Sequence, residues 1–331
     1  MTGSGRALTP LWFVLLSFTW GSSFLFIKLA LDGVSPGTIV LFRLILGALT
    51  LNLIVLLTRR RLPREWKLIG HLAVVAFLLC VLPLLLFAWA GQYIPSGLSA
   101  IYNATTPLMT LVISLAVIPN ERLTPFRTFG VLLGAVGILI VLGPWQLFED
   151  ASALHGTGWA QLACLLGTAS YGLAFAWMRR FVTGKHNYDA PTIAATQVGL
   201  AALMMLIPAP FLLAQPLHLD TTIVVSLLIL GILGSGLAYI WNTAIVNAWG
   251  ATPASTVTYL SPLVGVVLGI LILAETITWN QPVGGVITIL GILISQQVIT
   301  PDLLRRRDSA SRTASAPPLN PEPAQPLRKD R

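Results

Sequence analysis

Charged residues are scarce in this chain of 331 residues. They make up 10% of it, against roughly 25% in an average globular protein, while 55% of the residues are hydrophobic. A soluble domain with so few charges could not cover its surface, so much of the apolar side-chain area must face lipid. The scarcity therefore excludes a soluble globular protein and predicts an all-α integral membrane protein.

The sequence is also poor in groups that carry chemistry. Its two cysteines, Cys80 and Cys164, stand 84 positions apart inside apolar stretches, which predicts small core residues and neither a disulfide nor a metal site. There is no H-E-x-x-H, no C-x-x-C, no P-loop and no pair of intramembrane aspartates. The segment Gly234-Ser235-Gly236 resembles a serine elbow only faintly, without a histidine at matching depth. We expect no enzyme, no metal and no cofactor.

Long apolar runs are what the chain does contain. A hydrocarbon core of about 30 Å needs roughly 20 apolar residues per helix. Breaking the runs at proline, glycine and charge clusters predicts ten transmembrane helices in the lipid bilayer. They lie near residues 10 to 31, 36 to 57, 68 to 90, 95 to 118, 125 to 143, 156 to 179, 190 to 213, 221 to 247, 253 to 274 and 281 to 299.

The net charge of +8 predicts orientation and no nucleic-acid partner, because the basic residues stand between the apolar runs. If ten spans alternate, eighteen of the twenty lysines and arginines fall on one side of the membrane, while Asp32, Asp220 and Glu275 fall on the other. Cytoplasmic loops retain positive charge. We therefore expect a multi-pass protein of the plasma or inner membrane with both termini in the cytoplasm.

The two halves of the chain repeat each other at offsets of 151 to 155 residues. Trp20-Gly21 matches Tyr171-Gly172, and Thr106-Pro107-Leu108 matches Ser261-Pro262-Leu263. Each unit holds five spans, and an odd number makes the second unit enter the membrane from the opposite side. The pattern predicts two inverted five-helix repeats, an architecture typical of alternating access, with a solute site near the midplane.

These repeated residues resemble the EamA-type repeat of the drug/metabolite transporter superfamily. The resemblance rests on Trp20-Gly-Ser-Ser-Phe with Lys28, on Pro36 to Arg43, on the Thr106-Pro107 span ending in Glu121, and on Gly130 to Gly137. It covers residues of about 10 to 299 and implies a ten-helix metabolite permease, often an exporter of amino acids or related solutes. The expected organisation is a cytoplasmic N-terminus (1–9), two repeats (10–148 and 149–300) and a disordered cytoplasmic tail (301–331).

Arg43 is the one charge expected deep in a span, because it lies about 10 Å along its helix at 1.5 Å per residue. It could face the cavity and bind a carboxylate or phosphate, or it could tie helix ends together. The second repeat has Gln197 at the equivalent position, which puts strict symmetry in doubt. For Lys28 we expect an ion pair with Asp32, four residues on.

Other candidates for a neutral, hydrogen-bonding pocket lie beside prolines inside the spans. Pro83, Pro107 and Pro262 each free a carbonyl group, which is tolerated where a neighbour or a cavity satisfies it. Helix packing is the alternative role for the hydroxyl residues, and an interfacial belt is the alternative for the tryptophans. The candidate lining residues are Trp89, Gln92, Tyr93, Asn103, Thr105, Thr106, Tyr239, Trp241, Asn242, Ser255, Thr256, Thr258 and Ser261.

A single cavity arginine favours a small zwitterionic or neutral solute over a sugar nucleotide or a phosphorylated one. A multidrug or sugar-nucleotide exchanger and a non-transporting scaffold remain the alternatives. All acids lie at span ends, in loops or in the tail, so we expect no central proton relay. Glu121 and Glu275 could couple transport or simply cap helices. The G-x-x-x-G pairs at Gly130 and Gly265 permit close helix packing in a monomer or a homodimer.

Overall fold

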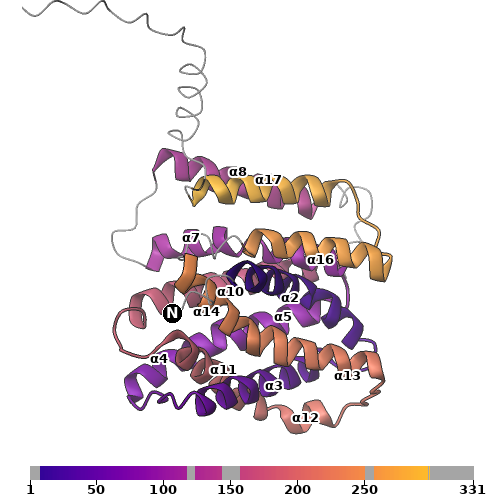
Figure 1. Cartoon of the computed structure of the whole chain (residues 1–331). Coiled ribbons are helices and arrows are strands. Elements are labelled where there is room, and N and C mark those ends of the chain that lie inside the picture. Colours follow the sequence, from indigo (N-terminus) through magenta and orange to yellow (C-terminus); the bar gives the residue numbers. More distant parts are fainter. Residues whose placement is uncertain (1–7, 118–123, 144–156, 250–256, 297, 299–331) are drawn as a thin grey trace, which may run out of the picture.

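The computed structural model describes residues 8–117, 124–143, 157–249, 257–296 and 298, and the regular structure in these ranges is helical (Figure 1). The predicted tail at 301–331, the N-terminal segment before residue 8, Glu121, Ser255 and Thr256 lie outside the described residues. The helices are α2 (Thr9–Ala30), α3 (Pro36–Leu57), α4 (Trp66–Ala76), η1 (Phe77–Val81), α5 (Leu82–Ala90), α6 (Ser96–Asn103), α7 (Thr106–Val117), α8 (Pro125–Leu142), α10 (Thr157–Phe181), α11 (Ala190–Leu206), α12 (Ala209–Leu213), α13 (Thr221–Leu228), η3 (Ile229–Leu237), α14 (Ala238–Trp249), α16 (Val257–Leu273) and α17 (Asn280–Ser295).

Seven helical stretches in the described ranges are long and apolar enough to cross a membrane. Three of these stretches each consist of two or more consecutive helices, namely Trp66–Ala90, Ser96–Val117 and Thr221–Trp249. The remaining expected spans correspond to the shorter apolar helices α11, α16 and α17. The chain is therefore a helical membrane protein, and the number of ten spans stays a prediction.

The helices begin where the sequence supplies a cap. Ser35 accepts a hydrogen bond from the backbone N–H of Thr38, at 3.3 Å, and Asp189 accepts one from the backbone N–H of Thr192, at 3.0 Å. Proline follows both caps within two residues, where its missing N–H costs nothing. Cap and proline together start α3 and α11 at equivalent points of the two halves.

Two π-helices interrupt spans that the sequence predicts as plain helices. η1 comes directly before Pro83, whose ring would clash with the preceding turn of a regular helix. η3 contains Gly231, Gly234 and Gly236 and lies 152 residues further along the chain. Both π-helices therefore occur at equivalent positions of the two halves.

The other interior prolines behave differently from each other. The fourth span breaks into α6 and α7 just before Pro107, where Ala104 and Thr105 leave the regular helix. α16 continues through Pro262 without a break in its described part. The predicted span 190 to 213 also ends early, because α11 stops before Pro208 and the chain resumes as α12.

Helices of one half pack mainly against helices of the other. α2 contacts α16, α14 and η3, and α10 contacts α7, α5 and η1 in the same pattern with the halves exchanged. α3 lies against α11, and α8 lies beside α17 as an outer layer (Figure 1). Cys80 and Cys164 lie buried in two separate core clusters, as expected of small core residues.

The α8–α17 pair is held by direct backbone contact. A Cβ atom added to Gly291 would lie 2.3 Å from the backbone nitrogen of Gly134, and one added to Gly130 would lie 2.4 Å from that of Ser295. The G-x-x-x-G pair of α8 thus packs inside the chain, as small residues allow. Gly265 also packs inside the chain, since a Cβ there would lie 2.6 Å from that of Ala100.

Gly291→Leu is expected to destabilise the folded protein by about 1–3 kcal/mol, because the new side chain would have to push two backbones apart. The measurement is the Tm of the purified protein in detergent. Gly70→Ala is the matched control, since nothing lies within 4 Å of a Cβ at that helical position. An unchanged Tm for Gly291→Leu would contradict the backbone contact.

Candidate functional site

Arg43 lies at the centre of a buried polar cluster between the two halves. Its side chain on α3 is 8% exposed, and its Nε donates a 2.9 Å hydrogen bond to the hydroxyl of Ser235 on η3. Its Nη2 lies beside Gly234, because a Cβ added to that glycine would be 3.6 Å from it. The deep arginine therefore joins α3 to η3 of the other half, and its terminal nitrogens retain donors beyond the bond to Ser235.

The second half makes the reciprocal contact. Gln197 on α11, at the repeat position of Arg43, is 2% exposed and donates a 3.3 Å hydrogen bond to the sulfur of Cys80 on η1. Gln197 follows Arg43 by 154 residues, and Ser235 follows Cys80 by 155. Each half thus sends one polar side chain from its second span to the π-helix of the other half.

The π-helices also receive hydrogen bonds from the first span of the opposite half. Trp20 Nε1 on α2 donates to the carbonyl of Gly234, at 3.4 Å. Ser170 Oγ on α10 donates to the carbonyl of Leu78, at 2.7 Å. A polar backbone group inside a bilayer needs a partner within the protein, and here the partner comes from the other half.

Two phenol groups and a thiol lie within electrostatic range of Arg43. Tyr171 on α10, Tyr239 on α14 and Cys80 all lie close enough to interact with its guanidinium electrostatically. Tyr239 also packs against the core cluster that contains Cys80. One cation edged by neutral donors can hold a carboxylate or another small anionic group, and it offers no nucleophile paired with a base.

Three predicted lining residues lie away from this cluster on the exposed end of the third span. Trp89 and Tyr93 are 37% and 47% exposed, and their ring centroids are 5.0 Å apart. Gln92 is exposed too, and its amide donates to the Trp89 carbonyl at 3.2 Å. This placement suits the alternative expectation of an interfacial belt.

The hydroxyl candidates of the fourth and ninth spans bond to nearby helices. Thr106 donates to the carbonyl of Asn103 across the break between α6 and α7, at 2.7 Å. Ser261 is 4% exposed and donates to the Val257 carbonyl, at 3.0 Å, beside the Ser17 carbonyl on α2. Asn242 is half-buried on α14, and Thr258 is half-buried on α16. None of these observations tests their predicted role in a pocket.

On the side of the bundle that holds Asp32, Asp220 and Glu275, polar side chains at the ends of spans connect one span to another. Lys28 donates to the carbonyls of Gly91 and Ile94, at 2.7 and 3.3 Å, so the predicted ion pair with Asp32 is wrong. Glu275 accepts hydrogen bonds from the backbone N–H groups of Ser96 and Gly97, at 2.6 and 3.0 Å. Glu275 therefore caps α6, which is the structural alternative that the sequence left open.

Loops on the side of the bundle that holds most lysines and arginines also connect the halves. Arg60, after α3, forms an ion pair with Asp189, before α11. Tyr188 donates to both oxygens of the Glu65 carboxylate, at 2.9 and 3.1 Å. In the part of the chain with described placement, no group of three or more His, Cys, Asp or Glu side chains could hold a metal ion.

Hydrogen bonding shifts the pKa values of Glu65, Tyr188 and Asp189 in these loop contacts. The backbone N–H of Glu65 and then the Tyr188 hydroxyl lower the pKa of Glu65, and the bond to Glu65 raises the pKa of Tyr188. Partial burial would raise the pKa of Asp189, but hydrogen bonds from Thr192 and the contact with Arg60 outweigh it and lower that pKa. The contacts are thus strongest with ionised carboxylates and a neutral phenol.

The sequence reading did not identify Ser235, Cys80 or Ser170 as partners in the central cluster. Cys80 and Ser235 lie within the π-helices, and Ser170 donates a hydrogen bond to one of them. The glycines of η3 and the proline after η1 are the signals from which these interruptions could have been inferred.

Comparison with known proteins identifies the family of this chain. The sequence profile described as the EamA-like transporter family matches residues 7–143 and again residues 158–296. The matches together cover most of the chain and occur once in each half.

Curated relatives cover most of the chain as well. The uncharacterized transporter YoaV of Bacillus subtilis is 26% identical over 283 residues, which are 85% of this chain and 94% of that protein. The uncharacterized inner membrane transporter YedA of Escherichia coli K12 is 25% identical, over 82% of this chain and 86% of that protein. A solved crystal structure superposes with a TM-score of 0.59 at 17% identity, over 89% of this chain, which supports the fold alone.

The contact between Tyr188 and Glu65 is expected to depend on pH. The pKa of Glu65 lies below its ordinary value of 4.5, so the contact stabilises above about that pH and is lost as pH falls through the shifted pKa. The raised pKa of Tyr188 keeps the contact up to and beyond its ordinary value of 10.0. Tyr188→Phe should lower Tm at pH 7 and have a smaller effect at pH 3.

Tyr93→Phe is the control, because Tyr93 is exposed and its ring contact with Trp89 survives the change. It should leave Tm unchanged at both pH values. An effect of Tyr188→Phe that is equally large at pH 3 and pH 7 would show that the bond to ionised Glu65 is not what it removes.

Proposed function

Because the chain belongs to the EamA-like transporter family, we propose that it carries a small zwitterionic or neutral metabolite, an amino acid or a related solute, out of the cell. The family and the apolar helices together indicate a multi-pass membrane transporter. The solute class follows from the charge available inside the spans. Arg43 is the one buried arginine in the described part of the chain, and carriers of several phosphates need more.

The proposed mechanism is alternating access between two inverted five-helix repeats. The support is the exchange of contacts described above: Arg43 to Ser235 is matched by Gln197 to Cys80 with the roles of the halves reversed. Such reciprocal pairs arise when two copies of one fold are related by a two-fold axis, and an odd number of five spans per copy would put that axis in the membrane plane. Reversing the pattern of contacts then opens the site to the other compartment. Both termini are proposed to lie in the cytoplasm of a plasma or inner membrane.

Arg43 is the residue proposed to contact the solute. A charge at this depth costs about 2.5–3.5 kcal/mol on insertion scales, so a role that offsets the cost is expected. Its bond to Ser235 fixes the side chain and leaves the terminal nitrogens for a carboxylate, which a guanidinium binds with two parallel hydrogen bonds. The phenols of Tyr171 and Tyr239 supply neutral polar edges to the same site.

The test is flux in liposomes that contain the purified chain and a panel of labelled amino acids and small metabolites. Uptake of at least one zwitterionic or neutral solute above protein-free liposomes is expected. Arg43→Gln should lower that flux about tenfold or more, because one charge-assisted hydrogen bond is worth about 1.5–3 kcal/mol. Glutamine is a suitable replacement because the equivalent position of the second half already holds Gln197.

Arg61→Gln is the matched control, since it removes one exposed loop charge from the same half. Its flux should equal that of the unchanged chain. A folded, inserted Arg43→Gln protein with full flux would make Arg43 a structural tie only. A folded chain that moves no member of the panel would argue against the proposed solute class.

A further inference from the structure

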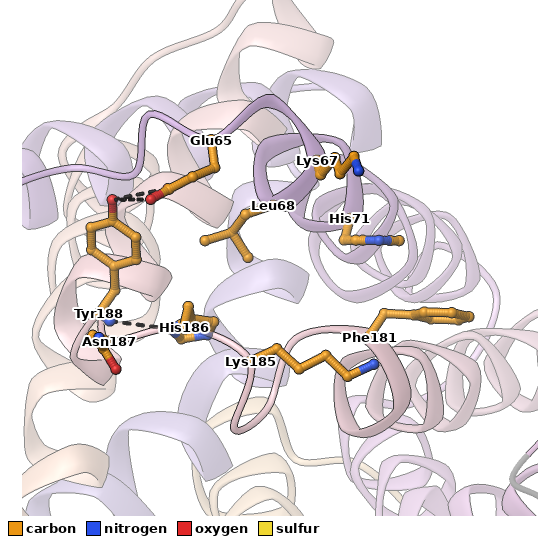
Figure 2. A pocket seen from close by; sticks show the side chains of 9 residues that line it. All are labelled: Glu65, Lys67, Leu68, His71, Phe181, Lys185, His186, Asn187 and Tyr188. Atoms are coloured by element: carbon orange, nitrogen blue, oxygen red, sulfur yellow. Dashed lines mark hydrogen bonds between the residues drawn. The ribbon is translucent and has the colours of Figure 1, made fainter.

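The loops that join the halves on the basic side enclose a pocket outside the central cluster. Its volume is about 620 Å³, and it lies between the start of α4 and the segment that follows α10 (Figure 2). Leu68, in the first turn of α4, and Phe181, the last residue of α10, form apolar parts of its wall. Because both are at ends of apolar helices, the pocket lies at the depth of lipid head groups. Trp66, 84% exposed beside it, suits this depth.

One end of the pocket is cationic. Lys67 and Lys185 supply the positive charge, and Figure 2 shows His71 between Lys67 and Phe181. The His71 ring is stacked on Phe181, with centroids 5.0 Å apart and 8° between planes. Lys185 lies over the same ring and uses one donor on the Arg180 carbonyl, at 2.5 Å, which leaves two donors of its ammonium group.

The start of α4 adds to the attraction for an anion at this end. Lys67 and Leu68 belong to its first turn, and no side chain caps that turn. Backbone N–H groups of such a turn favour a negatively charged ligand. The lysines supply the full charges, so the helix end only reinforces them.

The opposite end of the pocket is anionic. Glu65 and Tyr188 lie together there, joined by their hydrogen bonds, and Asn187 lies beside them (Figure 2). His186, between the two ends, accepts the backbone N–H of Tyr188 on Nδ1 at 3.2 Å, so its neutral ring carries the proton on Nε2 as a donor. A ligand that matches both ends carries both an anionic group and a cationic amine.

We propose that this pocket binds the head group of phosphatidylethanolamine, with its phosphate at Lys67 and Lys185 and its amine at Glu65. Basic pockets between transmembrane helices hold lipid phosphates, and a primary amine can donate to a carboxylate where a trimethylated amine cannot. The site joins α4 of the first half to the α10–α11 connection of the second, so a bound lipid bridges the halves. It is separate from the cluster around Arg43 and does not depend on which solute is carried.

Native mass spectrometry of the purified full chain tests the site by titration with phosphatidylethanolamine. Phosphatidylcholine with the same acyl chains is the matched ligand control. One phosphatidylethanolamine should bind several-fold more tightly than phosphatidylcholine. The double variant Lys67→Gln, Lys185→Gln should weaken binding about tenfold, while Arg59→Gln, Arg61→Gln, which removes two loop charges outside the pocket lining, should not.

Glu65→Gln tests the amine end, because its amide oxygen can still accept from Tyr188. It should abolish the preference over phosphatidylcholine and leave phosphate binding intact. Equal loss in both double variants would show bulk charge attraction and overturn the site. Tighter binding of phosphatidylglycerol than of phosphatidylethanolamine would overturn the amine assignment. Full competition by soluble phosphoethanolamine would overturn the lipid as the source of the phosphate.

Discussion

The hydrocarbon core demands that every polar group inside it find a partner within the protein. This constraint determines how the two halves of the chain fit together. Arg43 and Gln197 each find a partner on the π-helix of the opposite half. Trp20 and Ser170 bond to carbonyls of the same two π-helices. Neither half could satisfy these groups alone, so the polar cluster is made by the association of the halves.

In the proposed mechanism, the same groups would allow the halves to move against each other. A contact made of a few hydrogen bonds can be exchanged for contacts of similar strength, whereas tightly packed backbones cannot separate cheaply. The α8–α17 pair, one helix from each half, is in direct backbone contact and would stay together during such a movement. The loop contacts of Arg60 with Asp189 and of Tyr188 with Glu65 join the two halves at one end of the bundle. At the opposite end, His218 donates its backbone N–H to the Gly33 carbonyl at 3.0 Å.

Much of this arrangement could be read from sequence, because hydropathy and repetition are properties of the chain itself. The deep position of Arg43 and the close approach at Gly130 were predictable. The partner Ser235 was not, because it depends on how α3 rotates against η3. Trp89 and Tyr93 show the limit clearly. The π-helix η1 precedes Trp89 in the same span, and one extra residue per turn rotates the helix that follows by about 100°.

The central claim is that the halves rock against each other about the cluster at Arg43. Spin labels on Arg61 and Gly184 report the basic side, and labels on Asp32 and Gln215 report the other side, with one label of each pair in each half. Distances within both pairs, measured by electron–electron double resonance with and without the transported solute, test the claim. We predict that one distance shortens as the other lengthens. Two distances that stay fixed, or that change in the same direction, would contradict it.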